Sequence, residues 1–354
     1  MDKRVEDLAD ILVNYSANVQ KGETVQIVGG AFAEELIKAC YVRVLRKGAF
    51  PRVHVGLEGM GYLYYKNARD MHMKHFPSLE MAEMKKTDAV IYIGGSMNKR
   101  ELSSIDPKKM ALRQKVMRPI SKYRVKHTKW VLCIHPTASY AQDADMSLAE
   151  FEDFVYNATN LDWKAFGQTY SKKQKTLQKA KTIRIKAAGT DLTMSVAGMK
   201  FVLGAGQHNM PCGEIFTAPV ADSVNGRIVY EWPQVYGGRE VEGITLEFKD
   251  GKVVKSTATK NEAYLKQMIA MDKGSCYVGE LGIGTNYRIQ KYIKNILFDE
   301  KIGGTVHLAL GQAYEDCNGK NASALHWDMI KDLRVGGELI ADGKVVQRNG
   351  KFLI

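Results

Sequence analysis

The fold of the first half of the chain is decided by residues 23–58, ETVQIVGGAFAEELIKACYVRVLRKGAFPRVHVGLE. A β-rich run ends there in Gly29 and Gly30, and a segment with apolar residues at helical spacing follows and ends at Gly48. A second β-rich run begins at Phe50. Because a strand, a helix and a further strand in this order place the two strands in parallel, we expect a β-α-β unit.

The same arrangement continues to about residue 140. The pattern predicts an amphipathic helix near residues 5–15, strands at 87–96 (TDAVIYIGGS) and 128–137 (TKWVLCIHPT), and a basic helix at 107–126. The glycine pairs at the strand ends do not continue as G-x-G-x-x-G, so they indicate tight turns and not a dinucleotide site. We therefore expect an α/β domain over residues 1–165, built on an open, mainly parallel sheet.

The second half of the chain changes to short alternating strands separated by Gly, Asn and Asp. Asp250-Gly251 and Asp342-Gly343 lie between β-rich runs and predict hairpin turns, and a helix is expected near residues 261–271. We therefore expect residues 166–354 to form a mainly antiparallel β (α+β) domain.

Length and composition indicate a globular protein in a reducing compartment. A chain of 354 residues with 45% hydrophobic residues can bury a large core. No apolar run approaches the roughly 20 residues that span a bilayer, and the N-terminus is charged, so we expect a cytoplasmic protein with no membrane partner. The five cysteines are scattered without C-x-x-C spacing, which indicates reduced side chains and argues against a cysteine-based zinc site.

The formal net charge of +12 raises the question of an anionic partner. The densest basic segment, Tyr170–Lys186, intersperses its lysines with ordinary helical and strand residues and has no interleaved aromatic residues. A solvated helix face or linker explains this segment, so we do not expect nucleic acid binding.

The last fifth of the chain concentrates side chains with metal-ligand chemistry. His326 and Asp328 flank Trp327, so on a strand both polar side chains point to one face and form a chelate, while Trp327 packs on the other face. Further acidic and imidazole side chains of the second domain lie at or near Gly or Pro at the expected strand edges: Glu214, Glu280, Asp299, Glu300 and His307.

Charge balance favours two metal ions over isolated glutamates. Burying carboxylates without compensation is very costly. Two divalent ions carry +4 and would balance the −4 of ionised Glu214, Glu280, Glu300 and Asp328, with His307 and His326 neutral. An oxygen-rich set without thiols suits Zn, Co or Mn, and the ligand types alone do not choose among them.

Four strings carry a resemblance to a known family: NMPCGEIFTAP (209–219), GELGIGTN (279–286), LFDEKIGGTVHLALGQAY (297–314) and GKNASALHWDMI (319–330). In this order and at these separations they resemble the dinuclear metallo-aminopeptidases typified by aminopeptidases T and S, the thermophilic metalloprotease family. The segment from Thr137 to Trp163 is similar to the one that leads into that family's catalytic domain. The resemblance implies a homodimer that removes N-terminal residues from peptides with a free N-terminus, with residues 166–354 as the catalytic domain.

The resemblance also implies a residue assignment. Its metal ligands fall on Glu214, Glu280, Glu300, His307, His326 and Asp328, and its active-site tyrosine falls on Tyr314. Two metal ions would activate a water for attack on the peptide carbonyl, with Glu214 or Glu280 carrying its proton and Tyr314 stabilising the oxyanion. His307 lies farther along the chain from the pair Asp299-Glu300 than the corresponding histidine does in some members of the family. Glu300 is therefore either a direct ligand or a neighbour of one. Without the resemblance, a core tyrosine is a better explanation of Tyr314 than a catalytic one.

A different class of enzyme competes with this interpretation. A mononuclear Fe(II) dioxygenase that cleaves 2,5-dihydroxypyridine-type rings needs only two histidines and one carboxylate, which His307, His326 and Asp328 supply. Such a site leaves three glutamates without a role and with excess negative charge. The dinuclear hydrolase uses all of them, so the sequence favours the peptidase.

Overall fold

The computed structural model describes residues 2–354 and divides into two compact units. The first unit comprises the chain up to Leu161 together with Gly206–Pro211, and the second comprises Asp162–Ala205 and Cys212–Ile354. The return of Gly206–Pro211 to the first unit adds a short strand to its sheet, a feature that the single boundary expected from the sequence does not include.

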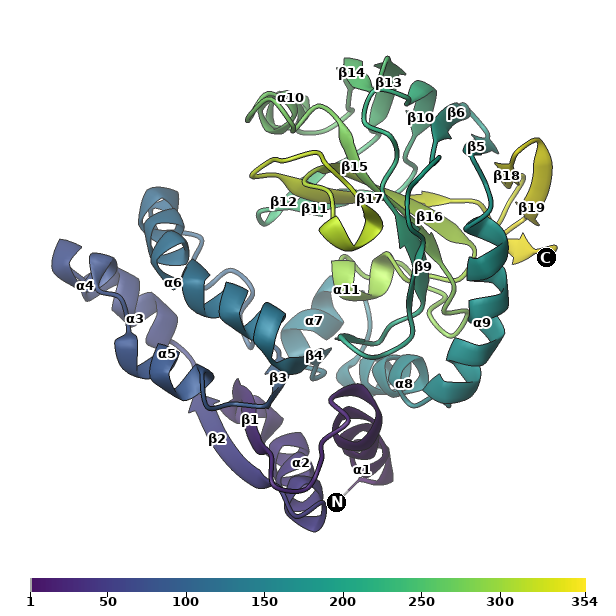
Figure 1. Ribbon diagram of the computed structural model, residues 1–354. Helices are drawn as coiled ribbons and strands as arrows, with labels where there is room; N and C mark the ends of the chain where they lie inside the picture. The colour runs from purple at the N-terminus through teal and green to yellow at the C-terminus, as the bar shows by residue number, and fades with distance from the viewer. Residues whose placement is uncertain (1) are drawn as a thin grey trace. The chain divides into compact units, whose positions relative to one another are not determined.

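The first unit is an α/β domain around a parallel sheet, as predicted (Figure 1). Its strands run in the spatial order β2-β1-β3-β4-β8, and every neighbouring pair is parallel. The bounds are β1 (Thr24–Gly30), β2 (Phe50–Gly56), β3 (Ala89–Gly94), β4 (Lys129–Ile134) and β8 (Asn209–Met210). The β-α-β unit of residues 23–58 forms because β1 and β2 pair in register from Thr24 with Phe50 to Gly30 with Gly56.

Helices connect the strands of this unit. Helix α1 continues into π-helical turns at Ile11–Ser16, and a short 3-10 turn at Ala31–Ala33 precedes α2. The helices are α1 (Lys3–Asp10), α2 (Glu34–Arg46), α3 (Met60–Asn67), α4 (Asp70–Lys74), α5 (Ser78–Met84), α6 (Pro107–His127), α7 (Ala138–Asp143) and α8 (Leu148–Thr159). Helix α8 begins with a capping box, in which the Ser147 and Glu150 side chains bond each other's backbone N–H groups.

The second unit consists mainly of antiparallel sheets, which confirms the predicted fold class. An eight-stranded sheet has the order β14-β13-β10-β6-β5-β18-β19-β20, and a five-stranded sheet has the order β17-β16-β15-β9-β7. The strands of the larger sheet are β5 (Thr182–Ala187), β6 (Thr190–Ser195), β10 (Asn225–Val229), β13 (Thr245–Lys249), β14 (Lys252–Thr257), β18 (Glu338–Ala341), β19 (Lys344–Arg348) and β20 (Lys351–Phe352).

The five-stranded sheet positions the polar cluster. Its strands are β7 (Val202–Gly204), β9 (Glu214–Thr217), β15 (Val278–Gly284), β16 (Thr305–Gly311) and β17 (His326–Asp332). Around it lie α9 (Trp163–Leu177), α10 (Glu262–Ile269), α11 (Ile296–Asp299), the 3-10 turn Glu315–Cys317 and the hairpin of β11 (Gln234–Tyr236) and β12 (Arg239–Val241). Both predicted hairpin turns are present, with positive φ at Asp250, Gly251, Asp342 and Gly343.

One face of the five-stranded sheet packs into the core of this unit. The alternating residues Leu281, Ile283, Val306, Leu308 and Trp327 are all buried in one hydrophobic cluster with residues of the eight-stranded sheet. Because side chains alternate along a strand, the intervening residues of β15, β16 and β17 point to the opposite face. That second face is free to carry polar chemistry.

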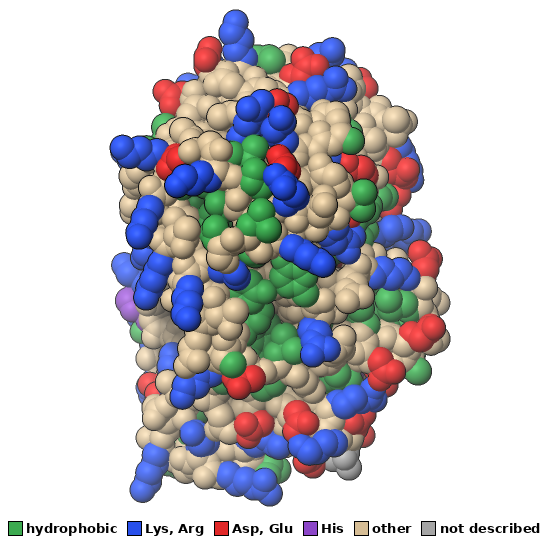
Figure 2. All heavy atoms as spheres, turned by 90° about the vertical axis from the view of Figure 1, so that its right-hand side faces the viewer, with side chains coloured by type: hydrophobic (Ala, Val, Ile, Leu, Met, Phe, Trp, Pro, Cys, Tyr) green, Lys and Arg blue, Asp and Glu red, His purple; other side chains and the backbone are tan. Residues whose placement is uncertain are grey.

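Surface features bear on two expectations from the sequence. Within residues 2–354, no helix is long and apolar enough to cross a membrane. On the face drawn in Figure 2, Lys and Arg side chains cover much of the surface, and Asp and Glu side chains lie among them mainly toward the top, right and bottom of the view. The lysine-rich segment predicted as a helix face forms the end of α9 and the start of β5.

Candidate metal centre

Five of the six predicted ligands lie on one face of the five-stranded sheet. Glu214 is on β9, Glu280 on β15, His307 on β16, and His326 and Asp328 on β17. The register pairs Glu214 with Gly284, His307 with Gly282, Asp328 with Ala309 and His326 with Gly311. Directly paired residues share a face, so the strand alternation brings together side chains from distant parts of the sequence.

Small residues between the ligands give the side chains room. A Cβ at Gly282 would lie 2.0 Å from Cε1 and 2.1 Å from Nε2 of His307, so the imidazole lies over a strand position that only glycine can occupy. A register shift between Val278 and Glu280 interrupts the pairing of β15 with β16. Such a bulge re-aims the residue that follows, here Glu280.

The ligand atoms form two overlapping groups. In one group, atoms of Glu214, Glu300 and His307 lie within 4.8 Å of one another, and in the other group those of Glu280, His307 and Asp328 do. Nε2 of His307 lies 3.6 Å from Glu214 Oε2 and 3.5 Å from Glu280 Oε1. Nε2 of His326 lies 3.3 Å from Glu280 Oε2 and 3.4 Å from Asp328 Oδ2.

Backbone carbonyls orient both imidazoles. Nδ1 of His307 donates to the carbonyl of Glu300 at 3.1 Å, and Nδ1 of His326 donates to the carbonyl of Gln312 at 2.9 Å. A carbonyl only accepts, so each Nδ1 carries the proton and each Nε2 is left as the ligand atom. This is the arrangement in which a histidine commonly binds a metal ion.

The cluster perturbs the pKa values of its members. Burial lowers the pKa of His307, but the carboxylates of Glu280 and Glu214 outweigh it and raise that pKa to about 9. In the same way Asp328 and Glu280 outweigh burial and raise the pKa of His326 to about 11. Burial raises the pKa of Glu300 to about 7, although Lys301 opposes the shift. The carboxylates therefore present a net negative field that attracts cations.

The donor set fits divalent metal ions. Among residues 2–354, Nε2 of His307 and Oδ1 of Asp328 are buried polar atoms without a hydrogen-bond partner. Buried polar atoms are normally satisfied, and an ion between carboxylates and imidazoles satisfies them here. The same ligand types are those of zinc, cobalt and manganese sites.

A model of the thermophilic metalloprotease (M29) family matches residues 1–352. The chain belongs to the thermophilic metalloprotease (M29) family. This confirms the resemblance read from the four sequence strings. Membership in a metalloprotease family means that the chain is a peptide hydrolase that depends on a divalent metal ion.

Members of the M29 family and solved structures resemble the chain over its full length. It is 28% identical to "Aminopeptidase AmpS" of Bacillus subtilis over 99% of this chain and 98% of that protein. The structure of wild-type AmpT from Thermus thermophilus matches with a TM-score of 0.89 at 22% identity, covering 99% of both chains. A 2,5-dihydroxypyridine dioxygenase from Pseudomonas putida matches at 16% identity with a TM-score of 0.65, covering 99% of this chain and 96% of that one. The two structural matches support the fold.

Tyr314 lies beside the cluster of this M29 member. Its hydroxyl is 3.4 Å from Nε2 of His326, and its ring contacts the rings of Phe216 and His326. The residue is 44% exposed, so it is not a core tyrosine. Burial of the hydroxyl and nearby carboxylates, Glu280 first among them, raise its pKa, so the hydroxyl stays protonated and able to donate.

Two residues of the centre were not identified from the sequence. Gly282 lies in GELGIGTN, and its role depends on the strand register, which the sequence does not give. Lys301 follows Glu300 directly, and its Nζ lies 3.3 Å from Glu214 Oε1 and also contacts the Glu300 carboxylate. Asp299, which belonged to the sequence cluster, accepts a hydrogen bond from the Ile293 amide and is in neither ligand group.

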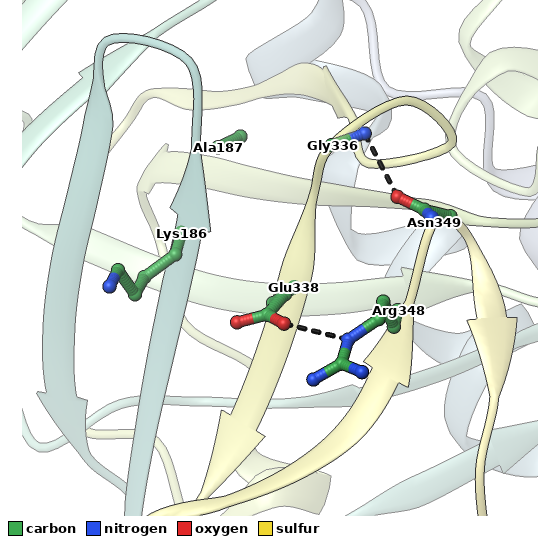
Figure 3. A pocket seen from close by; sticks show the side chains of 6 residues that line it. All are labelled: Lys186, Ala187, Gly336, Glu338, Arg348 and Asn349. Atoms are coloured by element: carbon green, nitrogen blue, oxygen red, sulfur yellow. Dashed lines mark hydrogen bonds and ion pairs between the residues drawn. The ribbon is translucent and has the colours of Figure 1, made fainter.

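Other hollows of the surface do not share these residues. A pocket of about 340 Å³ on the eight-stranded sheet is lined by Lys186, Glu338 and Arg348 (Figure 3). Arg348 donates to Glu338 there at 2.8 Å. In the first unit, the ring of Phe32 packs on Gly30 and Gly95, where a Cβ would approach it to 2.2 Å. Packing of this ring therefore explains the second glycine of each strand-end pair, Gly30 and Gly95.

Proposed function

We propose that the protein is an aminopeptidase that uses two divalent metal ions to remove N-terminal residues from peptides with a free N-terminus. The observation that carries the proposal is the convergence of three glutamates, one aspartate and two histidines on one cluster. The names of related proteins support cleavage at the N-terminus. Residues 166–354 would then be the catalytic domain.

Six residues would bind the two ions. The proposed ligands are Glu214, Glu280, Glu300, His307, His326 and Asp328. Two divalent ions bound by them would supply Lewis acidity and lower the pKa of a bound water. Zn, Co and Mn all suit the ligand types. Glu300 is proposed as a direct ligand because its carboxylate belongs to the group formed with Glu214 and His307.

The remaining chemistry is assigned to side chains of the chain itself. Glu280 and Glu214 lie closest to His307 and are the candidates to accept the proton of the attacking water. The Tyr314 hydroxyl, protonated and beside His326, would donate to the oxygen that becomes negatively charged. Five of the six ligands are buried or nearly so and His326 is partly buried, which limits bulk water and strengthens each of these interactions.

A mononuclear iron dioxygenase explains less of this cluster. Its ligands would be His307, His326 and Asp328, and a neighbour with that activity shares the fold. One Fe(II) ion supplies two positive charges fewer than two divalent ions do. Such a site therefore leaves Glu214, Glu280 and Glu300 with less compensation for their negative charge. Buried carboxylates without compensation are unfavourable, so the two-metal hydrolase is preferred.

Metal analysis combined with substrate hydrolysis tests the proposal. We expect close to two divalent ions per chain, loss of hydrolysis of aminoacyl-p-nitroanilides after chelation, and recovery with Zn, Co or Mn. The same substrates with an acetylated N-terminus are the control and should resist cleavage. One iron per chain with no hydrolysis under any metal would contradict the proposal and favour the dioxygenase.

Three further properties stay predictions. The homodimer follows from the family resemblance and is tested by light scattering. The cytoplasmic location accords with cysteines that form no disulfide in the described part of the chain. Absence of nucleic acid binding rests on the lysine-rich segment Tyr170–Lys186, which has no interleaved aromatic residues, and is tested at low ionic strength.

A further inference from the structure

Lys301 is a buried cation inside the ligand cluster. Its side chain is fully buried, and its Nζ lies 3.3 Å from Glu214 Oε1 and forms an ion pair with Glu300 Oε1. A buried ammonium is unfavourable unless carboxylates compensate it. Lys301 therefore shares the two glutamates with any ion bound beside them.

The two groups of ligand atoms differ in their relation to Lys301. In the group of Glu214, Glu300 and His307, both carboxylates contact the ammonium through Oε1. In the group of Glu280, His307 and Asp328, the carboxylates face the imidazoles of His307 and His326. A cation bound by the first group is therefore repelled by the Lys301 ammonium. Each glutamate of that group also already uses its Oε1 in the contact with Lys301.

Charge counting leads to the same asymmetry. The four carboxylates and Lys301 together carry a net charge of −3, because one ammonium offsets one carboxylate. One divalent ion reduces this to −1, whereas a second reverses the sign to +1. Without Lys301 the second ion would end at neutrality. The ammonium therefore opposes the second ion more strongly than the first.

We propose that the buried positive charge of Lys301 makes the two metal positions unequal. The position at Glu280 and Asp328 fills first and tightly, and the position at Glu214 and Glu300 is weaker and exchangeable. This inference rests on the two-metal centre of the proposed function. It concerns binding of the metal alone and is therefore tested separately from peptide hydrolysis.

The test is a Mn²⁺ titration of the full chain after chelator treatment, followed by calorimetry and electron paramagnetic resonance. For the wild type we expect the signal of isolated Mn²⁺ at one equivalent and coupled pairs only at excess metal. Lys301→Met should tighten the weaker dissociation constant about tenfold or more and lower the Tm of the metal-free chain. Lys301→Gln, which keeps a donor but no charge, should act in the same direction if the methionine variant does not fold.

Matched variants identify the two positions. Glu300→Gln should weaken the second binding event, and Asp328→Asn should weaken the first. Lys331→Met is the control, because Lys331 is also buried but lies on the opposite face of β17 and pairs with Glu231. It should leave both dissociation constants unchanged.

Three results would overturn the inference. They are equal affinity of the wild type for two ions, binding of one ion only in every variant, or dissociation constants that are unchanged or weaker when Lys301 loses its charge. The last result would mean that Lys301 orients the ligands and does not repel an ion. Unequal, Lys301-dependent binding without peptide hydrolysis would keep the inference and reject the aminopeptidase.

Discussion

Nε2 of His307 lies 3.5 Å from Oε1 of Glu280, across the boundary between two neighbouring strands. The contact requires the imidazole to lie over β15, and the residue directly opposite His307 in the register is Gly282. The imidazole that belongs to both groups of ligand atoms thus depends on Gly282, a residue without a side chain.

Gly282→Ala should displace the His307 imidazole, because the added Cβ would lie about 2 Å from the ring. We expect metal affinity to fall tenfold or more and peptide hydrolysis to fall with it, as measured by calorimetry and p-nitroanilide assays. Gly167→Ala is the control, since its Cβ would make only an ordinary contact of 3.6 Å with Ala205. Equal metal affinity in the two variants would show that His307 does not need this space.

Glu280→Gln should reduce kcat/KM by at least about 100-fold while leaving the fold intact. The carboxamide keeps the size of the side chain but cannot accept the water proton, and it is a poorer ligand. Circular dichroism and thermal unfolding check the fold. Glu247→Gln, at a partly exposed glutamate outside the cluster that pairs with Lys255, should keep full activity. A fully active Glu280→Gln would remove Glu280 from the site.

Tyr314→Phe separates catalysis from packing. If the hydroxyl stabilises the oxyanion, kcat should fall about 100-fold with little change in KM, because the donor acts only in the transition state. The Tm should hardly change, since the ring is 44% exposed and keeps its contact with Phe216. Unchanged kcat would assign Tyr314 to packing alone.

The first unit should lose stability in mild acid through His135. Burial lowers the pKa of His135 to about 4, and its ring stacks on Phe32. The unfolded chain binds this proton below about 6.5, so stability falls as the pH drops from about 6.5 to 4 and not above that range. The contribution is about 2 kcal/mol.

Denaturant unfolding at pH 7 and pH 4.5 measures this effect. His135→Gln removes the buried titrating group, so the variant should lose about 2 kcal/mol less than the wild type between the two pH values. His75→Gln, at an exposed histidine of the same unit, is the control. Equal acid losses in wild type and His135→Gln would contradict the assignment.

Local patterns were sufficient for the elements of the fold. The β-rich run ending at Gly30 and the helix ending before Gly48 form the predicted β-α-β unit, because propensity and apolar period agree there. The Asp-Gly pairs form their turns because positive φ is readily adopted by these residues. The return of Gly206–Pro211 to the first sheet has no local signal, since it depends on a pairing with β4 far away in the sequence.

By itself the sequence determined the two fold classes, the family, and the H-x-D pair on one strand face, because each depends on neighbouring residues or fixed motifs. Only the tertiary structure decided which side chains share a face. The register opposes Gly282 to His307, and the packing of the turn after α11 places Lys301 against Glu214. Such contacts join residues distant in the chain, and a shift of one residue in register would move each ligand to the opposite face.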